Sequence, residues 1–242
     1  MKTIGLLGGM SWESTLVYYR YINEVIRARL GGLASAKICL FSVNFSEIVQ
    51  YQRAGNWCMV AKTLAGYAQK IESSGADFLV ICTNTMHKVV PDIEKHIRIP
   101  VLHIADATAD RIRQRGLTSV GLLGTRFTME QDFYKGRLER KHHLQALIPP
   151  LRDRRLVNRV IYRELCAGRI VAKSRNAFLR IIRQLTGKGA EGVILGCTEI
   201  NLLLQQKHTP TPLFDTTVIH AEKAVEMALT DKLPRTGGKP TN

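Results

Sequence analysis

Two short polar blocks, each following an apolar run, contain the residues best suited to acid–base chemistry. The first block spans Cys82–His87 and the second spans Gly196–Glu199. A cysteine thiol has an ordinary pKa of about 8.5, so a modest shift produces a thiolate near neutral pH. Because Cys197 lies between an apolar run and the start of a helix, we expect its pKa to be lowered and the residue to accept protons. The alternative is that Cys197 only packs, as buried free cysteines often do.

An internal repeat relates the two blocks. The segment Ile4–Gly8 recurs as Val120–Gly124, and Gly75–Ile81 recurs as Gly189–Leu195, at offsets of 116 and 114. A third, weaker match follows at an offset of 112. Gly-Ala before apolar residues is common wherever a helix passes to a strand, but three matches in the same order predict two similar halves.

The repeat also selects the partner of the second-block cysteine. An offset of 114 pairs Thr83 with Cys197 and leaves Cys82 opposite Gly196. Side chains alternate along a strand, so Cys82 and Thr83 should point in different directions. The repeat therefore favours Thr83, rather than the adjacent cysteine, as the partner of Cys197.

Short apolar runs alternate with longer amphipathic ones, which is typical of βα units with parallel sheets. The predicted strands are Thr3–Leu7, Ile38–Ser42, Phe78–Cys82, Val101–Ile104, Ser119–Leu123, Gly192–Leu195 and Leu213–Asp215. The predicted helices include Ser14–Leu30, Trp57–Ser74, Met129–Lys141, Leu156–Ala167 and Ser174–Lys188. Helices that begin at the carboxyl ends of strands present free N–H groups, so two facing halves would place both polar blocks in one cleft.

Three motifs resemble the aspartate/glutamate racemase family: the leading segment Gly5–Ser11, the block Asn84–His87 and the block Gly196–Glu199. The resemblance extends from Lys2 to about Ala228 and is close to the enterobacterial amino-acid racemases of that family. It implies an α/β fold of two pseudo-symmetric three-layer domains with parallel sheets and an active site in the cleft between them. It also implies a homodimer and no pyridoxal phosphate.

The resemblance further implies where the domains and the site lie. The first domain would comprise residues 1–100 plus 210–230, and the second would comprise residues 101–209. Residues 231–242 lack periodicity, and we expect a disordered tail there. The expected site residues are the catalytic pair Thr83 and Cys197, with Asn84, Thr85 and Thr198 as hydrogen-bond donors and, by resemblance, Met10, Gln52, Thr125 and Thr128 around the substrate.

The chain departs from the family pattern at one position, because Thr83 replaces the cysteine that usually precedes Asn-Thr-x-His. We expect a cofactor-independent racemase of L-aspartate and L-glutamate in which Cys197 removes the Cα proton and Thr83 returns one, directly or through a water. No metal is expected. Neutral amino acids are the alternative substrates, since no anchor for a side-chain carboxylate can be assigned. Maleate isomerases and hydantoin racemases share the implied architecture.

The charge of the chain raises a different class of function. A formal net charge of +15 is typical of nucleic-acid binders, and a net +12 of it lies between Lys135 and Lys188. Arg155, Arg159 and Arg163 form one stripe of a predicted helix, but few aromatic residues accompany them. We interpret the charge as a solvated coat, away from both polar blocks, that attracts anionic substrates, with nucleic-acid binding as a minor alternative.

The remaining features indicate an ordinary reduced protein. Five cysteines without a Cys-x-x-Cys pair, and no apolar run of about 18 residues, favour a cytoplasmic location and no membrane span. We expect His87 to orient its helix, His103 and Asp215 to hold loops or steer Cys197, and Gly8 and Gly9 to let the backbone approach the ligand. Packing is expected for Cys39, Cys58 and Cys166, and surface exposure for His142 and His143.

Overall fold

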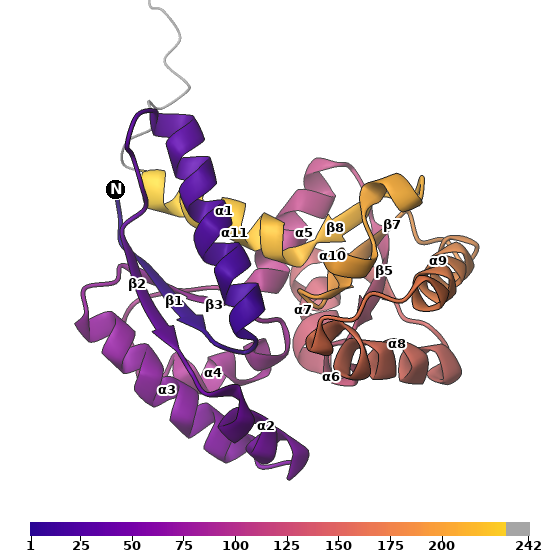
Figure 1. Cartoon of the computed structure of the whole chain (residues 1–242), viewed down its shortest axis with the longest axis horizontal. Coiled ribbons are helices and arrows are strands. Elements are labelled where there is room, and N and C mark those ends of the chain that lie inside the picture. The colour runs from indigo at the N-terminus through magenta and orange to yellow at the C-terminus, as the bar shows by residue number, and fades with distance from the viewer. Residues whose placement is uncertain (231–242) are drawn as a thin grey trace, which may run out of the picture.

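The computed structural model describes residues 1–230, so the predicted tail at 231–242 lies outside the described residues. The chain forms two lobes, each built on a four-stranded sheet in which all pairs are parallel (Figure 1). The strand order is β2-β1-β3-β4 in the first sheet and β6-β5-β7-β8 in the second. The identical order confirms the two similar α/β halves that the repeat predicts.

The elements of the first lobe and its connection run in the order β1 (Ile4–Gly8), α1 (Trp12–Leu30), β2 (Ile38–Ser42), α2 (Phe45–Arg53), α3 (Trp57–Ser73), β3 (Phe78–Ile81), η1 (Thr85–Val89), α4 (Val90–Ile93) and β4 (Val101–Leu102). The second half continues with α5 (Ile104–Gln114), β5 (Ser119–Gly124), α6 (Arg126–Glu130), α7 (Asp132–His142), β6 (Gln145–Leu147), α8 (Leu151–Arg163), η2 (Leu165–Ala167), α9 (Ala172–Thr186), β7 (Gly192–Gly196), α10 (Ile200–Leu203), η3 (Gln206–His208), β8 (Leu213–Asp215) and α11 (Thr216–Leu229).

The first sheet is covered on both faces, which gives the three layers that were expected. Alternate strand residues face opposite layers: Phe78 and Val80 pack under α1 and α11, whereas Leu79 and Ile81 pack against α3. Both layers exclude water from the sheet, as parallel sheets require. The same alternation places Cys82 in the layer under α1 and α11, away from the loops at the strand ends.

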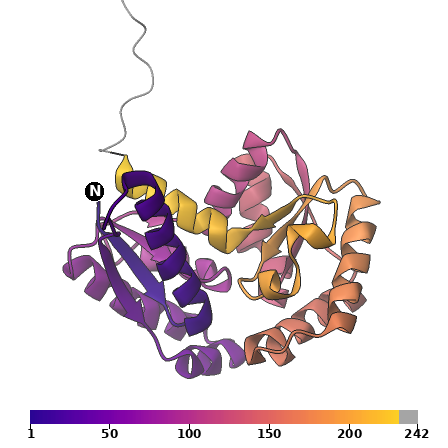
Figure 2. The same cartoon turned by 45° about the horizontal axis from the view of Figure 1, so that its top comes forward.

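Helix α11 joins the two halves. It leaves the second sheet after β8 and packs along α1 of the first lobe (Figure 1). On the edge away from α11 the lobes meet again, where α2 (purple) lies near α8 (pink to orange) in Figure 2. The first lobe is therefore completed by the last helix of the chain.

Strand pairing differs from the expected domain boundaries in two places. Strand β4 pairs with β3 and belongs to the first sheet, although the boundary at 100/101 assigned it to the second domain. Strand β8 pairs with β7 in the second sheet, although residues 210–230 were assigned to the first domain. Only α11, within that segment, packs on the first lobe.

Two predicted helices also differ from the structure. The predicted helix Met129–Lys141 is divided into α6 and α7, because Gln131 between them has an extended backbone. The predicted helix Leu156–Ala167 begins earlier, at Leu151, and ends at Arg163 before the short η2 turn. In the described part of the chain no helix is both long and apolar enough to cross a membrane.

Candidate active site

A cavity lies where the carboxyl ends of β3 and β7 face one another. It encloses about 440 Å³, including space open to solvent. Its lining residues come from both halves: Met10, Phe45, Gln52, Thr83, Asn84, Thr85, Met86, Thr125, Ile161, Tyr162, Cys166, Gly196, Cys197, Thr198 and Glu199. Parallel sheets place their ligands at this end of the strands.

Eight of the nine predicted site residues line this cavity. The exception is Thr128, which is fully buried one turn behind the wall. Its Oγ1 lies 3.1 Å from Thr125 Oγ1, so it supports a lining residue instead of facing the cavity. The expected contact of Thr128 with the substrate is therefore not supported by its position.

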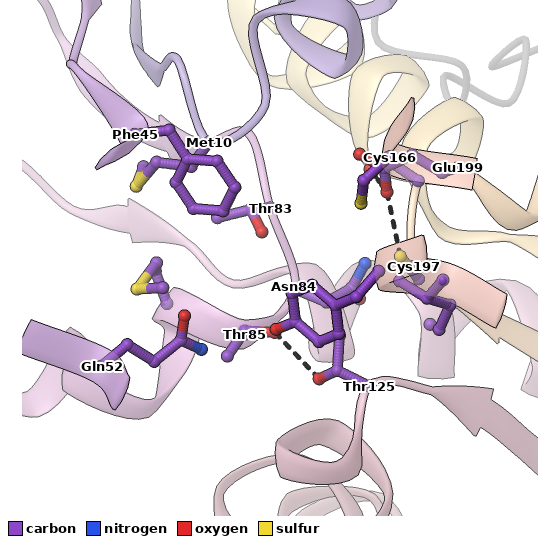
Figure 3. Close-up of a pocket in the computed structure, with 15 residues that line it drawn as sticks. Met10, Phe45, Gln52, Thr83, Asn84, Thr85, Thr125, Cys166, Cys197 and Glu199 are labelled. Atoms are coloured by element: carbon purple, nitrogen blue, oxygen red, sulfur yellow. Dashed lines mark hydrogen bonds between the residues drawn. The ribbon is translucent and has the colours of Figure 1, made fainter. Parts of the chain in front are cut away.

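Thr83 and Cys197 lie on opposite sides of the cavity (Figure 3). Each follows the equivalent strand of its own lobe, β3 for Thr83 and β7 for Cys197. The neighbouring Cys82 is fully buried in the first-lobe core and does not line the cavity. The two side chains can thus reach the two faces of a small molecule held between them.

The thiol of Cys197 forms a hydrogen bond with the carboxylate of Glu199. Cys197 Sγ donates to Glu199 Oε2 at 2.9 Å, as the dashed line in Figure 3 shows. Burial first, and then the negative charge of Glu199, raise the pKa of Cys197 well above its ordinary value. The expectation of a lowered pKa is wrong for this state, because burial and then the carboxylate of Glu199 outweigh the backbone N–H of Glu199, which favours the thiolate.

Glu199 is itself held by the first lobe. Its Oε1 accepts hydrogen bonds from Ser11 Oγ at 2.9 Å and from Ser14 Oγ at 3.1 Å. Its Oε2 also accepts from Thr198 Oγ1 at 2.8 Å. Ser11 caps the N-terminus of the 19-residue helix α1, where a negative charge is favourable. The carboxylate that contacts Cys197 is thereby fixed from both halves.

Asn84 offers an unused acceptor. Its Nδ2 donates to Thr216 Oγ1 at 3.0 Å, and Thr216 Oγ1 in turn donates to Leu195 O at 2.9 Å. Because the Thr216 hydroxyl proton is committed to Leu195, its oxygen must accept, and the Asn84 amide nitrogen must face it. Asn84 Oδ1 is then a buried acceptor without a partner among the described residues. It suits a ligand N–H, and it adds an acceptor to the donor role that the sequence predicts for this residue.

His87 orients the first-lobe block, as expected. Its Nε2 accepts the backbone N–H of Ile104 at 3.2 Å, which leaves the proton on Nδ1. Nδ1 therefore donates to the Thr83 carbonyl, 2.8 Å away. Thr85 Oγ1 adds a link to the second lobe, 3.1 Å from Thr125 Oγ1 (Figure 3). The loop that carries Thr83 is thus fixed at several points.

Several residues that line the cavity were not among the site residues predicted from the sequence. Phe45 and Met86 are apolar side chains near two predicted motifs, and Ile161 and Tyr162 belong to a predicted helix of the basic region. Cys166 also lines the cavity and is exposed, so it does not pack as expected; Cys58 is exposed as well. The arginine-bearing helix α8 therefore borders the cavity, and the description of this charge as a distant coat is wrong.

Other expectations are settled by local contacts. His103 and Asp215 cap α5 and α11, accepting from the backbone N–H of Ala105 and Thr217, so both hold loops. His142 is buried and bonded to Asp106 Oδ1 at 2.8 Å, so it does not lie on the surface, whereas His143 does.

Gly8 and Gly9 do not line the cavity, contrary to expectation. Gly9 has φ +87°, and a Cβ there would lie 2.3 Å from the Val43 carbonyl oxygen. The glycine is required by the turn after β1 and by its close approach to the loop after β2. This pair therefore shapes the first-lobe loop that carries Met10 and Ser11.

The fold and this site define a class of two-lobed α/β enzymes with a cavity between equivalent strand ends. The Asp/Glu/Hydantoin racemase family matches residues 7–224, and the chain belongs to this family. Its structure is similar to that of a proposed Asp/Glu racemase from Yersinia pestis, with 53% identity, a TM-score of 0.90 and coverage of 95% of this chain and 100% of that one.

Two further relatives extend the comparison. An aspartate racemase homologue from Pyrococcus horikoshii is 36% identical with a TM-score of 0.82, and 94% of this chain and 99% of that one are covered. The broad specificity amino-acid racemase RacX of Bacillus subtilis is 25% identical over 168 residues, which are 69% of this chain and 72% of the relative. The chain is therefore an amino-acid racemase by family.

Proposed function

We propose that the chain inverts the Cα centre of amino acids without a cofactor, using Cys197 on one face and Thr83 on the other. One observation carries the proposal: these two side chains follow equivalent strands and line opposite sides of one cavity (Figure 3). Inversion by proton transfer needs a base on one face of Cα and an acid on the other.

The first step uses Glu199 as the acceptor for the Cys197 thiol proton. The S–H proton moves along the 2.9 Å contact to Glu199 Oε2, which leaves a thiolate beside a neutral carboxyl group. The thiolate then takes the Cα proton, becomes a thiol again and leaves a carbanion. Because the free thiol has a raised pKa, this transfer depends on the carboxylate.

The second step returns a proton from the Thr83 face. A threonine hydroxyl cannot exist as a free anion near neutral pH, so Thr83 must take a proton from a water as it gives its own to the carbanion. The proton held by Cys197 and Glu199 returns to solvent, which balances the exchange. This relay is slower than removal of the Cα proton by Cys197.

The polar wall suits the two charged groups of an amino acid. Asn84 Oδ1, which has no partner among the described residues, can accept from an α-ammonium group. Thr85 and Thr125 line the same cavity, and their hydroxyl pair can donate to an α-carboxylate, whereas the Thr198 hydroxyl proton is already donated to Glu199. Donors aimed at that carboxylate also stabilise the negative charge that develops when the Cα proton leaves.

The cavity favours uncharged side chains over the L-aspartate and L-glutamate expected from the resemblance. Within the described part of the chain, no Lys, Arg or His lines the cavity, and Glu199 is its one ionisable carboxylate. A substrate carboxylate placed there would be desolvated without a cation. Gln52 and Tyr162 instead offer neutral hydrogen-bond groups. Broad activity on neutral amino acids, as the name of the Bacillus subtilis relative states for that protein, is therefore the stronger substrate proposal.

Cα–H exchange in D₂O over a panel of L-amino acids tests the reaction and the substrate class together. We expect exchange with neutral polar substrates and its loss, by at least ~100-fold, in Cys197→Ser. Cys58→Ser is the matched control, because Cys58 is exposed and does not line the cavity. Undiminished exchange in Cys197→Ser would contradict the proposal.

We also propose a homodimer in a reducing compartment. All five cysteines are free thiols, which supports a cytoplasmic location. On α1, Trp12, Leu16 and Tyr19 follow helical spacing and remain 60%, 56% and 49% exposed. A stripe of this kind supports contact with a second copy.

A further inference from the structure

A second cavity opens next to the first and shares two of its lining residues. It is lined by Val49, Gln52, Arg53, Arg126, Phe127, Asn158 and Tyr162, which belong to α2, α6 and α8; we call it the vestibule. Gln52 and Tyr162 also line the inner cavity. The vestibule encloses about 940 Å³ and the inner cavity about 440 Å³, in both cases including space open to solvent. It is therefore the roomier extension of the site.

The charge of the vestibule is opposite to that of the inner cavity. Arg53 lies at the end of α2 in the first lobe, and Arg126 begins α6 in the second. Among the residues that the structure describes, no acidic residue lines the vestibule. Within residues 1–230, neither guanidinium forms an ion pair with a carboxylate. Two arginines from opposite lobes thus face one space without a negative partner.

The second-lobe arginine is held in position by its neighbours. The Arg126 backbone N–H donates to Asn158 Oδ1 at 2.8 Å. Its guanidinium lies 5.5 Å from the ring centre of Phe127, which packs edge-on against Trp57 of the first lobe at 5.2 Å. Phe127 and Val49 give the vestibule apolar surface as well. The methylene groups of a long side chain can therefore pack on this apolar surface while its charged end group lies near the arginines.

We propose that the vestibule binds the anionic end of a long amino-acid side chain, with Arg53 and Arg126 as its anchors. This inference rests on the proposed racemase function, because it places the reacting Cα in the inner cavity. The small inner cavity forces a longer side chain out between Gln52 and Tyr162. Guanidinium groups pair with carboxylates in a bidentate manner, so the two arginines suit a terminal carboxylate.

The proposal gives the substrate range a definite shape. Short acidic side chains end inside the inner cavity, where no cation lines the wall, and are poor substrates. Acidic side chains of three or four methylenes reach the two arginines and are good ones. The preference for an acid over its neutral ω-amide should therefore rise with chain length, from L-aspartate through L-glutamate and L-2-aminoadipate to L-2-aminopimelate.

Exchange kinetics over this series test the chain-length dependence. For each acid and its ω-amide, kcat/KM for Cα–H exchange is measured in the wild type, Arg53→Gln, Arg126→Gln and the double variant. We expect the acid-to-amide ratio for L-2-aminopimelate to fall at least tenfold in the double variant, mainly through KM. Arg113→Gln is the matched control, because Arg113 is exposed on α5 and lines neither cavity. An unchanged ratio, or an equal fall in the control, would overturn the proposal.

Binding measured without turnover separates this inference from the proposed reaction. In a Cys197→Ser background, calorimetry with L-2-aminopimelate should give a Kd that rises at least tenfold when both arginines are replaced. Inorganic phosphate is the second probe: phosphate binding that is as tight as aminopimelate binding would show a free-anion site and overturn a side-chain subsite. Arginine-dependent binding of aminopimelate without exchange in the wild type would instead contradict the racemase proposal and leave the subsite standing.

Discussion

At the scale of single residues, the proposed reaction assigns Thr83 the step that limits full inversion, while the Cys197 face stays reactive. A cysteine at this position would supply an acid with a pKa nearer neutrality. We predict that Thr83→Cys raises the rate of inversion at least ~10-fold, with a smaller effect on exchange at the Cys197 face. Chiral chromatography measures inversion, and deuterium wash-in measures exchange.

The direction of the reaction constrains the same experiment. L- and D-enantiomers have equal free energies in water, so the two directions must balance at equilibrium, and Thr83 slows both. In the wild type, wash-in from one enantiomer should exceed inversion. Equal rates of both processes from both enantiomers would contradict the assignment. Cys82→Ala should retain most activity, because Cys82 is buried under α1 and α11 and does not line the cavity. If this variant were inactive, Cys82 and not Thr83 would be the acid.

A second prediction at the scale of single residues concerns the role of Glu199 as the acceptor of the Cys197 proton. The amide in Glu199→Gln keeps a similar shape and can still accept from Ser11 and Ser14, but it cannot take the Cys197 proton. We predict a loss of exchange of at least ~100-fold at neutral pH, with partial recovery at alkaline pH as the thiol ionises by itself. The pH profile is the decisive readout, because a purely structural defect would not be relieved by base. A parallel fall at every pH would refute the role.

At the scale of elements, three buried histidines join η1, the start of α5 and α11 at the junction of the lobes. His87 and His103 have ring centres 4.6 Å apart, and those of His87 and His220 are 5.8 Å apart. Burial, chiefly, lowers the pKa of His103 to about 3 and that of His220 to about 4. Burial and the two neighbouring histidines also lower the pKa of His87 well below its ordinary value.

These shifts predict acid sensitivity of the fold. The folded chain resists protonation, whereas histidines of the unfolded chain bind protons below about pH 6.5, so the free energy of unfolding falls as the pH decreases below that value. Each group contributes up to about 1.4 kcal/mol per pH unit. Urea unfolding at pH 7.5 and 5.5 measures the loss. His220→Gln should flatten it and exposed His143→Gln should not; a pH-independent free energy would contradict the prediction.

A charged cluster around Asp106 joins helices α5 and α7, and this carboxylate is protonated only at a lower pH than the one at which the unfolded histidines bind protons. Asp106 is bonded to Arg137 through two contacts of 2.6 and 2.7 Å, and to Lys141 at 2.6 Å. Burial opposes the charge of Asp106, but these partners outweigh it and hold the pKa of the carboxyl far below its usual range. Its contribution to stability is therefore present above about pH 4 and is not the source of loss near pH 6.

At the scale of the whole molecule, the exposed stripe on α1 predicts self-association. Trp12, Leu16 and Tyr19 are large apolar side chains on the outer face of the helix whose N-terminus holds Glu199. We predict a dimer by sedimentation that Leu16→Glu converts to a monomer. Leu33→Glu is the control, because Leu33 is fully exposed in a loop outside the stripe. A monomeric wild type, or a dimer that survives Leu16→Glu, would contradict the stripe as an interface.

Part of the basic region is explained by its partners within the fold. Arg137, Lys141 and Arg180 pair with Asp106 and Asp153, and Arg154 pairs with Glu130. The stripe of Arg155, Arg159 and Arg163 has no such pair among the described residues, and it follows the helix that borders the site. Steering of anions toward the vestibule accounts for it without a nucleic-acid partner.

The sequence by itself determined the fold class and selected Thr83 and Cys197 as the proposed catalytic pair, because both depend on local patterns. Apolar runs alternating with amphipathic ones define βα units, and the offset of 114 relates Thr83 to Cys197 without knowledge of contacts. The alternation of side chains along a strand was enough to predict that Cys82 and Thr83 point in different directions, and the structure has Cys82 in the core. Such features depend on neighbours within one or two elements.

Only the tertiary structure decided the electrostatics and the shape of the site. Ser11 lies 188 positions from Glu199 in the sequence, yet it holds the carboxylate that raises the pKa of Cys197. Arg53 and Arg126 share one space only because α2 and α6 meet across the lobes. The free energy of a charge depends on every group and on the water around it, which are properties of the packed molecule and not of spacing along the chain.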